Sequence, residues 1–126
     1  MRLVDTSAWI EYLLDENRET ALARALPEPS RWLVPTIVQL ELVKWLTRVL
    51  GKAEADRVIA FTDLCVVMDL TTTIALMAAE FCSQHKLSTA DAIIYATARS
   101  CGAELLTCDA HFKDLQDVMF IPKLVQ

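Results

Sequence analysis

Three aspartates stand where apolar runs of the sequence meet polar ones. Asp5 lies at the end of the short run "RLVD", the first predicted strand, and Asp109 comes just past the strand residues 104–107. Asp91 lies in the first turn of a predicted helix that is otherwise almost uncharged. In a parallel α/β sheet, ligands bind beyond the carboxyl ends of the strands, where the following helices begin. We therefore expect these three carboxylates to converge.

Each aspartate also has a simpler structural explanation. Asp5 could cap the helix that follows it, and Asp109 could open a turn toward His111. Asp91 stands three residues after Ser88, which fits a capping box. Taken one at a time, these are the commoner uses of such acids. Taken together they fit less well, because three uncompensated carboxylates in one crevice would raise one another's pKa values and destabilise the fold.

A divalent cation would relieve the repulsion between these carboxylates. A set of oxygen ligands without histidine or cysteine partners suits Mg²⁺ or Mn²⁺, and the usual chemistry of such a site is phosphoryl transfer. Glu41 is a fourth candidate ligand, because Ile37 and Trp45 put it on an apolar edge of a predicted helix. Lys44 and Arg48 leave open the alternative that Glu41 belongs to a solvated charged stripe.

The elements that would position these acids follow from the periodicity of the sequence. Strands are predicted at residues 2–5, 64–70, 103–109 and 118–122, the last of them at an edge of the sheet. Helices are predicted at residues 7–15, 16–26, 36–50, 53–64, 74–85 and 88–101, with a helical turn at 110–115. Strands that alternate with helices imply an α/β fold with a mostly parallel central sheet of four to five strands, flanked by helices in three α/β/α layers.

The helix at residues 36–50 has predicted signals at both of its ends. Thr36 and Gln39 form a second capping box, and Gly51 is a natural stop. Its apolar stripe is broad and includes positions 37, 38, 42, 45, 46 and 49. We expect one side of this helix to pack against the sheet.

Composition places the chain among globular proteins. Its 126 residues predict one domain over 1–126, long enough for a core without disulfides or metal staples. Hydrophobic residues make up 54 %, which suggests that a partner or a second copy covers apolar surface. No apolar run approaches the ~20 residues of a membrane span, so a cytoplasmic location is expected. The net charge of −5 argues against nonspecific nucleic-acid binding, although bound divalent cations would reverse the local field.

The sulfur and imidazole side chains show no metal-binding pattern in the sequence. His85 and His111 are isolated and are predicted to be surface or capping residues. The cysteines have no C-x-x-C spacing and are predicted to be buried, reduced thiols, namely Cys65, Cys82, Cys101 and Cys108. Cys108 adjoins Asp109 and is noted as a possible reactive thiol.

The order of these motifs resembles that of the PIN-domain ribonucleases of the VapC toxin type. The resemblance covers essentially the whole chain and rests on "VDTSAWIEYL", on "TIVQLELVKWL" with Glu41, and on "STADAIIYATARSCGAELLTCDAHF". In the last block Asp109 follows Asp91 by 18 residues. The resemblance implies a PIN-like fold.

The resemblance also implies an activity and a set of site residues. Members of the family are endoribonucleases that hydrolyse RNA phosphodiester bonds with metal-activated water. Their acidic quartet binds Mg²⁺ or Mn²⁺ and corresponds here to Asp5, Glu41, Asp91 and Asp109. Thr6 would orient a ligand or a water molecule, and Thr107 matches a small polar position near the fourth acid. Family members form homodimers and are inhibited by a cognate antitoxin that lies over the site, while RNA would be contacted by scattered side chains such as Lys44, Arg48 and Lys86.

Other functions remain open at this point. Phosphoryl-transfer hydrolases with an aspartate nucleophile resemble D-x-D-x-T after the first strand, whereas this chain has D-T-S-A-W and lacks the second acid. A phosphorylated receiver module would also need adjacent acids there. The alternative from another class is a PIN-like domain with a non-catalytic protein-binding or RNA-binding role. Retention of all four acids favours the nuclease.

Overall fold

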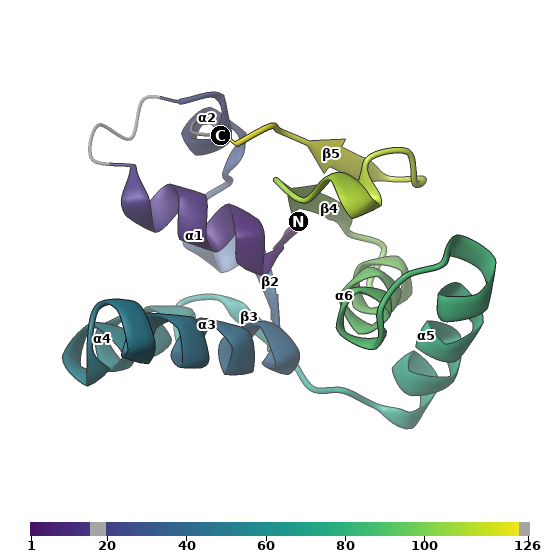
Figure 1. Cartoon of the computed structure of the whole chain (residues 1–126), viewed down its shortest axis with the longest axis horizontal. Helices are drawn as coiled ribbons and strands as arrows, with labels where there is room; N and C mark the ends of the chain where they lie inside the picture. Colours follow the sequence, from purple (N-terminus) through teal and green to yellow (C-terminus); the bar gives the residue numbers. More distant parts are fainter. Residues whose placement is uncertain (16–19, 124–126) are drawn as a thin grey trace.

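A five-stranded parallel sheet forms the centre of the structure, a computed structural model that describes residues 1–15 and 20–123 (Figure 1). The strands lie in the order β3-β2-β1-β4-β5, and every neighbouring pair is parallel. They are β1 (Arg2–Val4), β2 (Trp32–Pro35), β3 (Val66–Met68), β4 (Glu104–Thr107) and β5 (Val118–Phe120). The predicted edge position of the last strand is confirmed.

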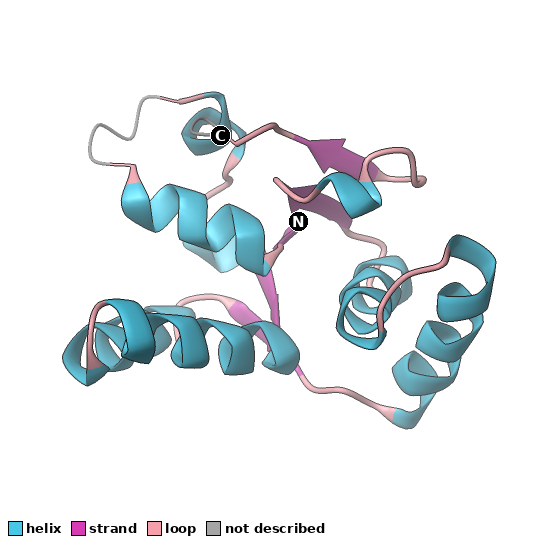
Figure 2. Ribbon diagram, in the orientation of Figure 1, coloured by secondary structure: helices cyan, strands magenta, loops and turns pink. Residues whose placement is uncertain are grey.

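Helices connect consecutive strands and pack on the sheet from both sides, which confirms the predicted three-layer α/β/α fold (Figure 2). They are α1 (Thr6–Leu14), α2 (Ala21–Ala25), α3 (Thr36–Val49), α4 (Lys52–Thr62), α5 (Thr72–His85) and α6 (Thr89–Ser100), with short 3₁₀ turns η1 (Pro29–Arg31) and η2 (Ala110–Phe112). Figure 1 shows α3 beside α4 and α5 beside α6. Within the described residues, no helix combines the length and apolarity needed to cross a membrane.

The core lies where the central strands meet the inner faces of the helices. Central strands β1, β2 and β4 are nearly continuous apolar runs, as expected for strands covered on both faces. Helix α6 is buried on most of its circumference, from Ala92 to Ala98. Trp32 packs edge-on against Trp9, with 4.8 Å between ring centroids, so this tryptophan belongs to the core.

Strand β2 was not predicted, and the capping box at Thr36 is wrong. The strand is short, shows no polar alternation and ends at Pro35, which also serves as the N-cap of α3. No side chain caps this helix, because Thr36 is already its first residue. Gln39 donates instead from Nε2 to Thr62 Oγ1, at 3.0 Å. Gly51 does end the segment as predicted, with a φ of 96° that favours glycine.

The helix predicted at residues 16–26 is shorter in the structure. Helix α2 begins after Thr20, whose hydroxyl accepts a hydrogen bond from the Ala23 backbone N–H. The start of the predicted helix, residues 16–19, lies outside the described residues. Pro27 follows soon after the helix, in agreement with the predicted stop.

Candidate metal centre

The register of the sheet brings Asp5 beside the end of β4. Leu3 pairs with Leu105 and Val4 with Leu106, so β1 and β4 end at the same level. The Asp5 backbone N–H then donates to the Leu106 carbonyl at 3.0 Å. Because both strands run in the same direction, the residue after β1 necessarily meets the last residue of β4.

Asp5 is a buried carboxylate, only 4 % exposed, with three hydrogen-bond donors. Oδ1 accepts from the Thr6 backbone N–H at 2.7 Å, and Oδ2 accepts from the hydroxyls of Thr107 at 2.7 Å and Ser7 at 2.8 Å. Burial raises the pKa of Asp5, and these hydrogen bonds oppose the shift without cancelling it. The charge of Asp91 raises the pKa further. A cation beside Asp5 would therefore stabilise its ionised form.

Ser7 is a site residue that the sequence did not single out. Its hydroxyl bonds Asp5, approaches Thr107 Oγ1 at 3.2 Å and accepts the Cys108 backbone N–H at 3.0 Å. It therefore ties the start of α1 to the end of β4. The available signal was its place as the third residue of D-T-S, one helical residue after Thr6.

Asp91 lies at the capped start of α6, but only half of the predicted capping box is present: among the described residues no hydrogen bond joins the Ser88 backbone N–H to the Asp91 carboxylate. The Ser88 hydroxyl accepts the Asp91 backbone N–H at 3.3 Å, which caps α6. The Asp91 carboxylate is half-buried and faces other acids. Burial raises its pKa, and the negative charges of Asp109 and Glu41 add to that shift. Helix capping and membership of an acidic cluster are thus compatible.

Asp109 and His111 form the open side of the cluster. The Asp109 carboxylate accepts the His111 backbone N–H at 2.9 Å, so Asp109 caps η2 as well. His111 Nδ1 lies 3.2 Å from Asp109 Oδ1 and 3.6 Å from Asp91 Oδ2. One ligand atom from each of these three residues falls within 4.8 Å of the others. His111 is exposed, as predicted, but the expectation that it stands alone and that the cluster lacks histidine is wrong.

Glu41 joins the cluster from α3. Its Oε1 accepts a hydrogen bond from Thr6 Oγ1 at 2.6 Å, and its charge acts on Asp91. The alternative left open by the sequence is resolved by these contacts, since the Glu41 carboxylate faces the acids. Lys44 and Arg48 lie further along α3 and are exposed.

Two hollows flank the acids. A groove of about 690 Å³ is lined by Thr6, Glu41, Trp45, Lys44 and Arg48, among others. A second hollow of about 410 Å³ is lined by residues that include Ser7, Asp109 and Lys123. Each hollow is therefore lined by one of the four acids, Glu41 or Asp109, and by at least one cationic side chain.

The donor set fits a hard divalent cation. Four carboxylates from β1, α3, α6 and the end of β4 interact electrostatically, and one of them is buried. In the described part of the chain, His111 is the one side chain in ion-pair contact with Asp91 or Asp109. Clustered oxygen ligands with little compensating positive charge suit Mg²⁺ or Mn²⁺. Asp5, Glu41, Asp91 and Asp109 are the residues that could hold the ion.

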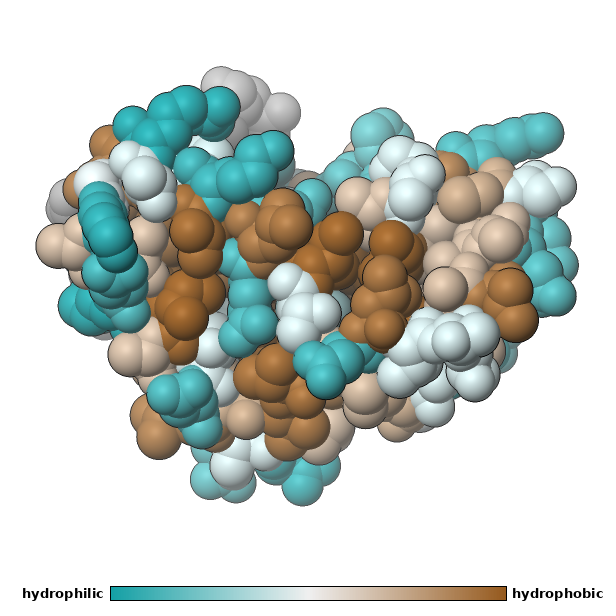
Figure 3. Space-filling view, turned by 90° about the horizontal axis from the view of Figure 1, so that it is seen from below, coloured by the Kyte–Doolittle hydropathy of each residue, from teal (hydrophilic) through white to brown (hydrophobic). Residues whose placement is uncertain are grey.

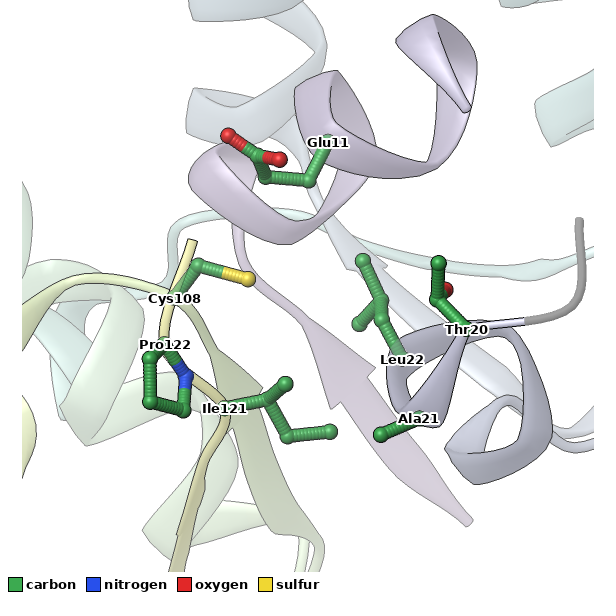
Figure 4. Close-up of a pocket in the computed structure, with 7 residues that line it drawn as sticks. All are labelled: Glu11, Thr20, Ala21, Leu22, Cys108, Ile121 and Pro122. Atoms are coloured by element: carbon green, nitrogen blue, oxygen red, sulfur yellow. The ribbon is translucent and has the colours of Figure 1, made fainter. Parts of the chain in front are cut away.

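The cysteines are free, but only Cys108 is buried. Its sulfur points into a small cavity of about 30 Å³ between α1, α2 and the segment after β5, with Leu22 and Ile121 opposite (Figure 4). Burial raises the pKa of the Cys108 thiol to about 11, and the negative charges of Glu11 and Asp5 act in the same direction. A thiol of this kind is a poor nucleophile at neutral pH, which argues against the suggested reactivity.

A parallel sheet with acids gathered at its carboxyl edge is the arrangement of an α/β domain with a candidate metal site. The chain belongs to the PIN domain family, whose family model matches residues 2–118. No curated protein matches the sequence.

Solved structures similar to the chain include several toxin–antitoxin complexes, which confirms the resemblance to VapC-type PIN domains. A complex from Klebsiella pneumoniae has a TM-score of 0.81 at 22 % identity, covering 94 % of this chain and 96 % of that one. DNA-bound VapBC from Salmonella typhimurium has a TM-score of 0.77 at 19 % identity, covering 96 % of each chain. VapC20 from Mycobacterium tuberculosis, a Sarcin-Ricin loop cleaving toxin, has a TM-score of 0.75 at 25 % identity, covering 97 % of this chain and 100 % of that one.

Proposed function

We propose that the protein is an Mg²⁺- or Mn²⁺-dependent endoribonuclease and the toxin of a toxin–antitoxin pair. The observation that carries this proposal is the electrostatic interaction of Asp91 with each of the other three acids, Asp5, Glu41 and Asp109, at the carboxyl edge of the sheet. The likeness to VapC20, a Sarcin-Ricin loop cleaving toxin, supports RNA as the substrate class.

The side chains of the site would have different roles in such a reaction. When bound, Mg²⁺ or Mn²⁺ supplies Lewis acidity, polarising a phosphate oxygen and lowering the pKa of water. Asp5 gives a fixed anchor, since three hydrogen bonds hold its carboxylate in one orientation. Asp91 and Asp109 provide less buried oxygens that face the solvent side. Thr6 orients Glu41 through their 2.6 Å hydrogen bond.

The two hollows offer a path for the RNA backbone across the acids. Lys44 and Arg48 line the groove on the α3 side, and Lys123 lines the hollow beyond Asp109. Positive side chains on either side of an anionic centre attract phosphates, while the centre itself requires the divalent cation to avoid repelling them. We propose that the bound RNA backbone lies over α3 on one side of the acids and over the turn after β4 on the other.

Exposed apolar side chains support partner binding, here by the cognate antitoxin and a second copy of the chain. Figure 3 views the molecule from below and shows apolar side chains gathered in a band over this face. The exposed large hydrophobics on α3 and around β3 include Leu40, Val43, Val49, Val66 and Val67. Apolar surface of this kind marks interaction sites in soluble proteins.

Cleavage of RNA by purified, antitoxin-free protein is the direct test. We expect fragments from a panel of structured RNAs in several millimolar Mn²⁺ or Mg²⁺ and none in EDTA. The alternative is a PIN domain with a binding role only, to which the apolar face would fit equally well. Intact RNA across the panel, with RNA or a partner still bound, would favour that alternative.

Replacing Thr6 by valine is expected to weaken Mn²⁺ binding by roughly 10-fold, because groups that orient metal ligands typically contribute 10- to 100-fold in affinity. Valine keeps the shape and removes only the hydroxyl that bonds Glu41. Titration calorimetry measures the affinity. Thr47→Val, an exposed threonine on α3, is the matched control. Equal affinities for Thr6→Val and the wild type would show that Glu41 needs no such orientation.

A further inference from the structure

We propose that His111 is a nitrogen ligand of the metal centre and shifts its preference from Mg²⁺ toward Mn²⁺ and later transition-metal ions. This inference rests on the proposed function, because it concerns the same acidic site. It extends the ligand set beyond the four carboxylates and assigns a role to a side chain that the acidic quartet leaves unused.

The position of the imidazole supports direct coordination. His111 Nδ1 lies within 3.6 Å of both Asp91 Oδ2 and Asp109 Oδ1. A ligand atom from each of the three residues falls within 4.8 Å of the others, a spacing that one ion between them can span. Carboxylate oxygens bind such ions at about 2.0–2.2 Å, and imidazole nitrogens bind at a similar distance.

The local backbone determines the position of the His111 imidazole beside Asp109. Asp109 caps η2 by accepting the His111 backbone N–H at 2.9 Å, so the two residues are held two positions apart on one tight turn. The His111 side chain is 77 % exposed, which leaves the ring free to turn toward an ion without displacing core atoms. Asp91 approaches the same ring nitrogen, Nδ1, from the first turn of α6.

The identity of the donor atom determines the metal preference. Carboxylate and water ligands suit Mg²⁺ and Mn²⁺, whereas imidazole suits transition metals, whose affinities rise from Mn²⁺ toward Cu²⁺. A site with oxygens alone would discriminate little between Mg²⁺ and Mn²⁺. Adding His111 strengthens the binding of Mn²⁺ and, to a larger extent, of Co²⁺ or Ni²⁺, while Mg²⁺ gains little.

The alternative is that His111 only forms ion pairs with Asp91 and Asp109. The contacts of His111 in the metal-free protein are the same for ion pairing and for metal coordination. The two roles are distinguished by a measurement on the metal-loaded protein. Magnetic resonance makes this distinction, because a nitrogen bound to Mn²⁺ couples to the unpaired electrons of the ion, whereas the nitrogen of an unbound imidazole does not. The chain contains two histidines, which makes the control simple.

The experiment is pulsed electron paramagnetic resonance of the full chain, purified without a histidine tag and loaded with Mn²⁺. We expect a ¹⁴N modulation in the wild type that disappears in His111→Asn and persists in His85→Asn. His85 is exposed and packs against Phe81 and Tyr95, and within the described residues it forms no ion pair with the acids. In calorimetric titrations, His111→Asn should weaken Mn²⁺ by roughly 10-fold and Mg²⁺ by less than about twofold.

The outcomes separate this inference from the proposed function. In one outcome, Mn²⁺ binds the wild type, its binding is lost in Asp91→Asn, and the bound ion shows no ¹⁴N modulation. That result would overturn the role of His111 and leave the acidic metal centre intact. Absence of Mn²⁺ binding in the wild type would overturn the metal centre itself. A ¹⁴N modulation retained in His111→Asn would also contradict the inference.

Discussion

Asp91→Asn is expected to lower the rate of RNA cleavage by at least about 100-fold. Groups that merely support metal ligands contribute about 10- to 100-fold, so a direct carboxylate ligand should contribute no less. Asparagine keeps the size of the side chain and the backbone N–H that the Ser88 hydroxyl accepts, so α6 stays capped. The measurement is the single-turnover cleavage rate of a susceptible RNA in saturating Mn²⁺.

Asp69→Asn is the matched control for this experiment. Asp69 also directly follows a strand, β3, but it is exposed at the far edge of the sheet. Its replacement should leave cleavage within about twofold of the wild type, since no partner of the acidic cluster changes. Cleavage by Asp91→Asn at the wild-type rate would remove Asp91 from the ligand set and leave only its place in the first turn of α6.

The same substitution is expected to stabilise the metal-free protein. Burial and the charge of Asp109 raise the pKa of Asp91 in spite of the hydrogen bond from Ser88 and the charge of His111, so the ionised carboxylate has a net cost in the fold. Asparagine removes that charge. In Mn²⁺ the wild type should instead be the more stable protein. A ligand that binds only the native state adds about 2.7 kcal/mol to the free energy of unfolding at 100 times its Kd. Chemical unfolding in EDTA and in Mn²⁺ gives both free energies.

The pH dependence has a definite sign. The Asp91 pKa is raised above its ordinary value of 3.8 in the folded protein, so the native state holds the proton to a higher pH than the unfolded chain. Its contribution to stability is complete below about pH 4 and is lost as the pH rises through the folded pKa. Metal-free wild type should therefore lose more stability than Asp91→Asn between pH 4 and 7. An Asp91→Asn protein that is less stable in EDTA throughout this range would indicate a helix-capping acid alone.

Much of the fold and the cluster was predictable because parallel sheets obey strong geometric rules. Asp5 and Asp109 follow strands whose register brings their ends level, and Asp91 opens a buried helix. From sequence each of these acids had two competing roles. In the structure Asp5 and Asp109 each cap a helix start and also belong to the cluster, and Asp91 lies in the first turn of α6 while its carboxylate faces the cluster. The start of a helix is stabilised by negative charge, and a metal site needs carboxylate ligands, so both roles favour an acidic residue.

The features that escaped prediction depend on side-chain direction or on very short elements. The hydroxyl of Ser7 and the ring of His111 are ordinary surface groups until the ends of β1 and β4 meet. Strand β2 has four residues and ends in Pro35, so its apolar run merged with the signal of α3. Glu41 was ambiguous for a similar reason, because only its hydrogen bond with Thr6 decides which way it faces.

The place of β1 in the sheet has a consequence for the timing of synthesis. Within the domain β1 is the first strand to be made, yet it lies between β2 and β4, and β4 begins only at Glu104. Until then Asp5 lacks the hydroxyl of Thr107, and Asp109 does not exist. A nascent chain thus carries three of the four acids without a complete centre. The four acids can therefore meet only after Asp109 has been made and β4 has paired with β1.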